Sequence, residues 1–167
     1  MRHWFNMSLT AQTRLPSAPA AGRAVLWGGL LCGVGDLSFA FVYYGLLQGL
    51  GVVHVMQSVA GGLLGRATYS GAAASASLGV ALHFLIAFII AAIYVALSRK
   101  AAALRERPFV FGALYGAGAY VVMQMIVLPL SAWHSPFWPP NVALIPFIGH
   151  IVLVGLPIAL ATRRFAC

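Results

Sequence analysis

Three side chains that can bind or release a proton lie inside long apolar stretches of this chain: Asp36, His83 and His150. Asp36 is the only acid in those stretches, and the chain has one other acid, Glu106. A carboxylate at the centre of a bilayer costs about 2.5–3.5 kcal/mol on insertion scales, so it should be protonated, hydrogen-bonded or paired with a base. The functional interpretation is a proton-titrating site. The structural interpretation is an interhelical hydrogen bond, which the lack of a second relay carboxylate favours.

The two histidines permit a different chemistry, because imidazoles on facing helices can ligate a b-type haem. His83 and His150 are the candidate ligands. Isolated histidines in helix bundles more often form hydrogen bonds between helices, so the sequence predicts no cofactor and leaves haem b as the minority alternative. No further ligand lies near either histidine, and no Cys/His zinc spacing occurs, so no metal site is predicted.

Membrane-spanning helices are the elements that must position these residues. The 167 residues are 62% hydrophobic and 7% charged, against about 25% charged in a soluble domain. We predict an all-α polytopic membrane protein with four transmembrane helices. The predicted domain covers 24–161, between tails at 1–23 and 162–167, with spans at about 24–47, 73–97, 109–130 and 141–161. Segment 49–71 is too short to cross a core of about 30 Å and predicts one short interfacial or re-entrant helix.

Basic residues predict the orientation. Nine of the ten lie before the first span, between the second and third spans, or after the fourth, and Arg66 stands alone on the other side. The positive-inside rule therefore places both termini in the cytoplasm of a bacterial inner membrane. These charges are interspersed between apolar runs, so we interpret them as topogenic and expect no nucleic-acid partner. The expected partners are the lipid bilayer and either further copies of this chain or other membrane subunits.

Small residues at four-residue steps mark the faces expected to pack, because helices in lipid associate through close backbone approach and polar contacts. Polar residues recur on the same stripes, which predicts that they point toward protein. The predicted helix-packing residues are Gly29, Gly33, Gly79, Gly112 and Gly116, and the predicted buried polar cluster is Asp36, His83, Tyr120, Gln124 and His150.

Four sequence pieces from 80–155 also suggest a family. They are the histidine-bearing run Ala81–Ile90, the glycine-bearing run Gly112–Gly116, the run Met123–Leu130 that ends in Pro-Leu, and the Gly-His pair within Phe147–His150. This succession resembles small bacterial inner-membrane proteins of the YagU-like family. The resemblance implies that His83 and His150 are family features and suggests a link with acid tolerance, without a mechanism.

The leading functional prediction is a non-enzymatic accessory or scaffold subunit of a membrane assembly, motivated by the glycine stripes. A proton-linked channel or transporter that uses Asp36 with His83 and His150 is the first alternative. A haem-binding electron-transfer subunit is the second. The sequence contains no nucleophile motif, phosphate-binding glycine loop or paired carboxylates, which favours a role other than enzyme.

Overall fold

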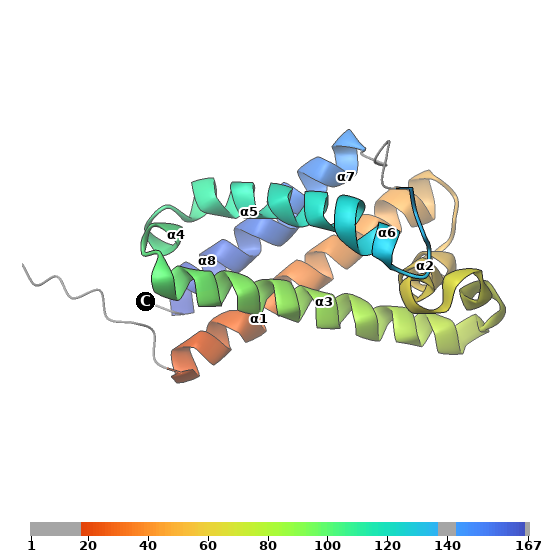
Figure 1. The fold of residues 1–167 in the computed structure, drawn as a ribbon, viewed down its shortest axis with the longest axis horizontal. Helices are drawn as coiled ribbons and strands as arrows, with labels where there is room; N and C mark the ends of the chain where they lie inside the picture. Colours follow the sequence, from red (N-terminus) through yellow and green to blue (C-terminus); the bar gives the residue numbers. More distant parts are fainter. Residues whose placement is uncertain (1–17, 137–142, 166–167) are drawn as a thin grey trace, which may run out of the picture.

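We describe the fold from a computed structural model of the chain, in which residues 18–136 and 143–165 are described. Every regular element in those ranges is a helix (Figure 1). In chain order they are α1 (Ala18–Ala40), η1 (Phe41–Leu47), α2 (Val52–Leu64), η2 (Gly65–Ser70), α3 (Ala72–Lys100), α4 (Ala103–Glu106), α5 (Pro108–Val122), η3 (Met123–Val127), α6 (Leu128–Leu130), α7 (Leu144–Gly149), η4 (His150–Gly155) and α8 (Leu156–Phe165).

Four of the continuous helical stretches are long and apolar enough to cross a membrane: Ala18–Leu47, Ala72–Lys100, Pro108–Leu130 and Leu144–Phe165. The predicted all-α polytopic fold is therefore confirmed. The first stretch begins six residues before the predicted start, because Pro19 lies in its first turn, where a proline costs no backbone hydrogen bond. The predicted start of the fourth span, residues 141–142, lies outside the described ranges.

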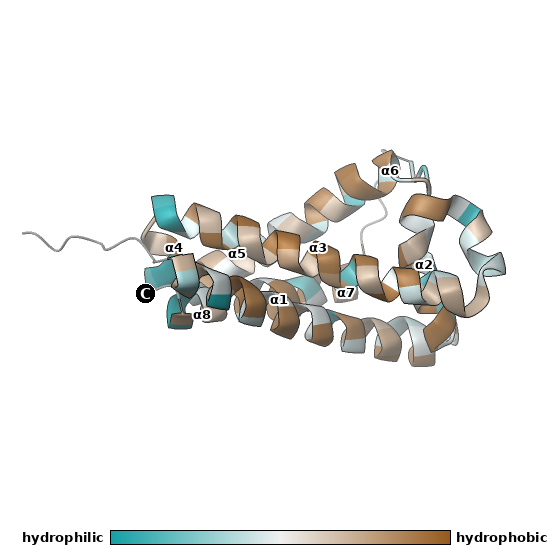
Figure 2. Cartoon of the chain, turned by 90° about the horizontal axis from the view of Figure 1, so that it is seen from below, coloured by the Kyte–Doolittle hydropathy of each residue, from teal (hydrophilic) through white to brown (hydrophobic). Residues whose placement is uncertain are grey.

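Charged residues lie at one end of the bundle. The start of α1, the connection through α4, and the end of α8 meet there, and α2 occupies the opposite end (Figures 1 and 2). Figure 2 shows hydrophilic residues at these two ends and apolar residues between them. The charged end is also structured. Arg105 is buried and donates to the carbonyl of Ser98, and the Tyr94 hydroxyl donates to the carbonyl of Leu104 at 2.9 Å. The connection through α4 thus caps the end of α3.

The spans form two layers, with α3 and α5 in front of α1 and α8 in Figure 1. α1 packs extensively on both α3 and α8, and α5 packs on α8 and η4. α3 and α5 do not pack along their lengths. One polar contact bridges them: the Tyr115 hydroxyl donates to the carbonyl of Ile90 at 2.7 Å. The bundle is therefore open on the side between α3 and α5.

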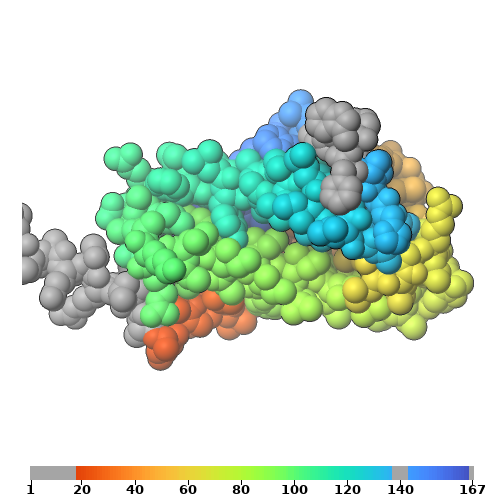
Figure 3. Space-filling model, viewed as in Figure 1, coloured from red at the N-terminus to blue at the C-terminus, as the bar shows by residue number. Residues whose placement is uncertain are grey.

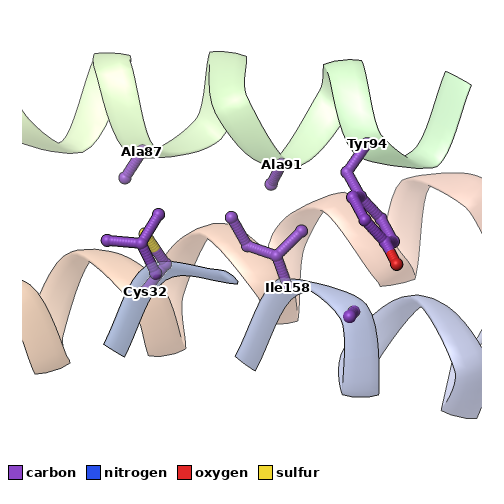
Figure 4. Packing of buried hydrophobic residues seen from close by; sticks show 7 residues of the cluster. Cys32, Ala87, Ala91, Tyr94 and Ile158 are labelled. Atoms are coloured by element: carbon purple, nitrogen blue, oxygen red, sulfur yellow. The ribbon is translucent and has the colours of Figure 1, made fainter. Parts of the chain in front are cut away.

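A dry cluster of buried side chains holds α1, α3 and α8 together near the charged end (Figure 4). Ala87 and Ala91 on α3 face Cys32 on α1 and Ile158 on α8, and Ala91 and Ile158 are completely buried. Small residues on α3 let the neighbouring helices approach closely, which is how helices gain packing energy in lipid. This cluster fixes the mutual positions of the three helices that also supply the polar residues.

Three of the four spans contain a stretch of π-helix: η1, η3 and η4. Prolines account for two of them, because Pro129 and Pro157 have no N–H to donate to a carbonyl of the preceding turn, and the backbone there widens. Pro146, in contrast, lies in the first turn of α7, where its missing donor leaves no hydrogen bond unmade. The π-turns place Gln124 and His150 in locally widened helix.

Helix α2 lies against the outer part of α3 instead of standing apart. The backbone of α2 at Met56 touches α3 at Gly79, where any Cβ would collide with the carbonyl of Met56. Gln57 donates to the carbonyl of Ala72 and to Ser75 Oγ, both at 3.1 Å. The indole of Trp133 donates to the carbonyl of Ser58 at 2.9 Å. These contacts seat α2 as a cap over the end of the bundle away from the charged residues.

Candidate functional site

A cavity of about 190 Å³ lies between the spans, and it contains four of the five residues of the predicted polar cluster. Each of these four comes from a different span: Asp36 from α1, His83 from α3, Gln124 from η3 and His150 from η4. The full lining is Cys32, Asp36, Val59, His83, Ile86, Ala87, Ile90, Met123, Gln124, Leu128, His150 and Val154. The volume is enough for several water molecules.

Asp36 and His150 are the closest charged or titratable pair in the cavity. The Nδ1 atom of His150 lies 3.9 Å from Oδ1 of Asp36, and their side chains are 21% and 19% exposed, respectively. This separation exceeds a hydrogen bond, so a small movement or one bridging water would join them. The pair can be a carboxylate with an imidazolium or two neutral groups. These two states differ only in the position of one proton, and neither has a net charge.

The hydrogen bonds of the two histidines fix which ring nitrogen bears the proton in the neutral state. Nε2 of His83 lies 2.9 Å from the carbonyl oxygen of Gly33, and Nδ1 of His150 lies 3.0 Å from that of Pro146. Carbonyl oxygens only accept, so each of these nitrogens must donate. Nδ1 of His83 and Nε2 of His150 are therefore lone-pair acceptors, available for a proton or a donor group.

Gln124 contributes an unsatisfied group to the cavity. Its Oε1 atom is buried and has no hydrogen-bond partner among the described residues. Leaving a buried polar atom unpaired costs about 1–3 kcal/mol, so such atoms usually have a ligand, water or mechanical reason. An atom of this kind beside Asp36 and His150 indicates that the cavity receives something that can donate a hydrogen bond.

Tyr120, the fifth predicted residue, supports His150 instead of lining the cavity. Its ring packs edge-on against the His150 ring, with centroids 5.1 Å apart. Its hydroxyl accepts from the backbone N–H of Ala143 at 2.9 Å and donates to the carbonyl of Ala143 at 3.3 Å. Because Tyr120 is buried and its hydroxyl is occupied, it holds the imidazole in place from behind.

The predicted packing glycines all lie against neighbouring helices of this chain. Gly29 and Gly33 of α1 face the rings of Phe88 and Phe84, and Gly79 faces α2. Gly112 and Gly116 lie against α8 and η4, where a Cβ on Gly116 would stand 2.8 Å from Cα of Ile151. The glycine stripes therefore position α5 and η4, and with them His150, within one copy of the chain.

Two contributors to the site were missed from the sequence. Val59 brings α2 into the cavity wall, although the spacing suggested only a surface or re-entrant helix. The Trp133 indole covers Gly61 and fixes α2 in place. The glycine at 61 is the one sequence signal for this contact, because an aromatic ring can stack on backbone only where no Cβ intervenes.

Haem ligation by His83 is in competition with a hydrogen bond that this histidine already makes. Nε2 of His83 donates to Gly33, so ligation through that atom would require this hydrogen bond to break. Within residues 18–136 and 143–165, no three His, Cys, Asp or Glu side chains come together in a way that could hold a metal ion. The haem alternative stays a prediction.

No protein-family model, curated protein or solved structure matches this chain. The resemblance to the YagU-like family therefore stays a prediction, and the function must be argued from the site itself.

Proposed function

We propose that this multi-pass membrane protein moves protons, or a solute coupled to protons, through the cavity that holds Asp36, His83, Gln124 and His150. The observation that carries the proposal is that one polar side chain from each of the four spans lines the same cavity. Ionisable groups inside membrane segments are costly, and they typically belong to proton relays or substrate pathways.

The proton-binding atoms follow from the tautomers. A proton arriving from one side can be taken up at Nε2 of His150. The imidazolium can then release its other proton from Nδ1 to Oδ1 of Asp36, 3.9 Å away, once the ring turns this N–H from the carbonyl of Pro146 to which it otherwise donates. His83 offers Nδ1 as a second acceptor on the same cavity. The proton count balances, because each proton accepted by an imidazole matches one passed on to the carboxylate or to a bridging water.

A transporter fits the surroundings of the cavity better than an open channel. On one side the cavity meets the dry cluster through Cys32, Ala87 and Val154, which are nearly fully buried. On the other side α2 contributes Val59 to its wall. Packed protein thus borders the cavity on both of these sides, and we expect passage along the bundle to require helix movement. The π-turns at η3 and η4 provide local sites for it, because such turns are less regularly bonded and recur at functional positions.

The scaffold hypothesis loses its original motive. It rested on glycine stripes as surfaces for other subunits, and those stripes pack inside the chain.

We also propose, from the basic residues, that both termini face the cytoplasm of a bacterial inner membrane. Among the described residues, Arg66 is the basic residue away from the charged end, because it lies in η2, which packs against α2.

The test is a proton-flux measurement on the full-length protein in liposomes that contain a pH-sensitive dye. Asp36→Asn should reduce flux to the leak of protein-free vesicles. Glu106→Gln is the matched control, since it makes the same change at the other acid, in α4 at the charged end, and should leave flux unchanged. If Asp36→Asn conducts like the wild type and only lowers the thermal stability, Asp36 is a structural hydrogen bonder and the proposal fails.

A further inference from the structure

The open side of the bundle contains an apolar groove of about 560 Å³ between α3 and α5. It exists because α3 packs mainly on α1 and α5 packs mainly on α8 and η4, while α3 and α5 meet only locally, around Tyr115. Its lining is almost entirely apolar and includes Ile89 and Ile93 from α3 with Leu114 and Val122 from α5, all of which are substantially exposed. Figure 3 shows this face, with α3 in green and α5 in cyan.

The groove and the polar cavity are neighbours. Ile86 and Ile90 of α3 and Met123 of η3 line both of them. Shared walls mean that the polar cavity lies at the inner end of a lipid-facing groove, with one layer of side chains between them. The cavity is therefore approachable from the side of the bundle through the groove. A methionine among the three separating residues provides a flexible side chain that can adapt to an entering molecule.

The polar end of this path is rich in acceptors. Oε1 of Gln124 is buried and unpaired among the described residues, and Nδ1 of His83 and Nε2 of His150 are lone-pair acceptors because their other nitrogens donate to carbonyls. The Asp36 carboxylate adds further acceptor capacity. An occupant that donates hydrogen bonds would satisfy these atoms, whereas one that only accepts would leave them unpaired.

We infer that the groove and cavity together bind a membrane-soluble molecule with an apolar chain and a hydroxyl head, which enters sideways from the bilayer. The chain lies in the groove between α3 and α5, and the hydroxyl donates to the unpaired Oε1 of Gln124 in the cavity. This inference adds an occupant to the site of the proposed function, but occupancy does not depend on proton flux, so the two can fail separately.

A second copy of the chain fits the groove less well. Apart from Trp27 on α1, the large hydrophobic side chains that this protein exposes along its four spans, such as Leu31, Leu85 and Ile148, have no donor group. They would fill the groove but bring no donor to the acceptors of the cavity. An alkane-like lipid tail has the same deficiency. The unpaired acceptors are thus the feature that selects a hydroxyl-bearing occupant.

The test uses the full-length protein in nanodiscs with a photoreactive 1-hexadecanol that has its diazirine beside the hydroxyl. Labelled residues are mapped by mass spectrometry. Unlabelled 1-hexadecanol should compete about tenfold better than its methyl ether, as expected for one net hydrogen bond. An alkyl hydroquinone serves as a further competitor. If it competes better than hexadecanol, the natural occupant is a ring-bearing quinol; if worse, an aliphatic alcohol. Either result supports a hydroxyl head.

Two glycines provide a matched pair of variants. Gly118 lines the groove and Gly22 lies on α1 near the charged end, and a Cβ at either position meets nothing within 4 Å. Gly118→Leu should fold, fill the groove and abolish labelling, and Gly22→Leu should label like the wild type. Gln124→Leu should keep the labelling but remove the preference for alcohol over ether.

Three outcomes would overturn the inference. Labelling that spreads evenly over lipid-facing residues means that no site exists. Equal competition by the alcohol and its ether means that the groove holds lipid tails only. A dimer in native mass spectra that Gly118→Leu dissociates, with no labelling of the groove, means that a second copy occupies it. A loss of flux in Asp36→Asn without labelling of the groove would leave the proposed function intact and reject only this occupant.

Discussion

The dry cluster and the polar cavity are built from the same helices, yet they have opposite properties. Around Ala91 and Ile158 the helices touch with fully buried small and branched side chains. About two turns further along the bundle, α1, α3 and η4 line the polar cavity with titratable side chains. Ala87, Cys32 and Val154 belong to both regions and form the boundary between them.

The difference comes from how the backbones are spaced. In the dry cluster, alanines on α3 let α1 and α8 approach closely. Toward the cavity, the ring of Phe84 lies over Gly33 on one side, and the π-turn at η4 widens the helix on the other. The ring and the wider turn do not fill all the space between the spans. The dry cluster stabilises the fold. The cavity region is packed less tightly and leaves room for a site, as functional regions commonly do.

The largest expected effect tests that contrast with a truncation in each region. Ile158→Ala should destabilise the protein by about 3 kcal/mol, because a fully buried side chain leaves a void that tight neighbours cannot fill. Leu128→Ala should cost only about 1 kcal/mol, because Leu128 already borders a cavity. Thermal unfolding in detergent measures both. Equal losses would mean that the cavity region is packed as tightly as the dry cluster.

A smaller effect is expected where α5 meets η4, because this contact sets the position of His150. Gly116→Ala should destabilise the protein by about 2 kcal/mol and disturb the cavity, since its Cβ would collide with the backbone of His150 and Ile151. Gly118→Ala on the same helix has open space and should stabilise the protein by up to about 1 kcal/mol through helix propensity. A melting temperature that does not fall in Gly116→Ala would contradict the close contact there, and one that falls in Gly118→Ala would contradict the open space at that position.

The sequence supports the fold better than it supports the site geometry. Hydropathy and basic residues are enough to predict four spans, because the requirement to satisfy backbone groups in lipid leaves few alternatives. Four-residue steps also suggest that Asp36, His83 and Gln124 face protein. The sequence does not indicate that α3 and α5 stay apart, since that depends on how α3 packs on α1 and how α5 packs on α8 in three dimensions. The docking of α2 depends likewise on contacts between distant residues, such as Trp133 with Ser58.

The smallest expected effect contrasts two glutamines under the same substitution. Gln57 of α2 makes two hydrogen bonds with its amide N–H groups, to Ala72 and Ser75, so Gln57→Leu should destabilise the protein by about 1 kcal/mol and loosen the cap. Gln124 has a buried, unpaired Oε1, so Gln124→Leu removes no known bond and should leave stability unchanged or raise it by about 1 kcal/mol.

The sign of the stability change in Gln124→Leu distinguishes a structural role of the Gln124 amide from a role in binding an occupant. A glutamine retained in a cavity where leucine is equally stable has no structural task there, and its amide is free to act on an occupant. Thermal unfolding of both variants, measured in the same detergent, gives the two signs directly. If Gln124→Leu destabilises the protein as much as Gln57→Leu does, the Gln124 amide is already satisfied in solution, and the acceptor-rich cavity is a structural water site within the bundle.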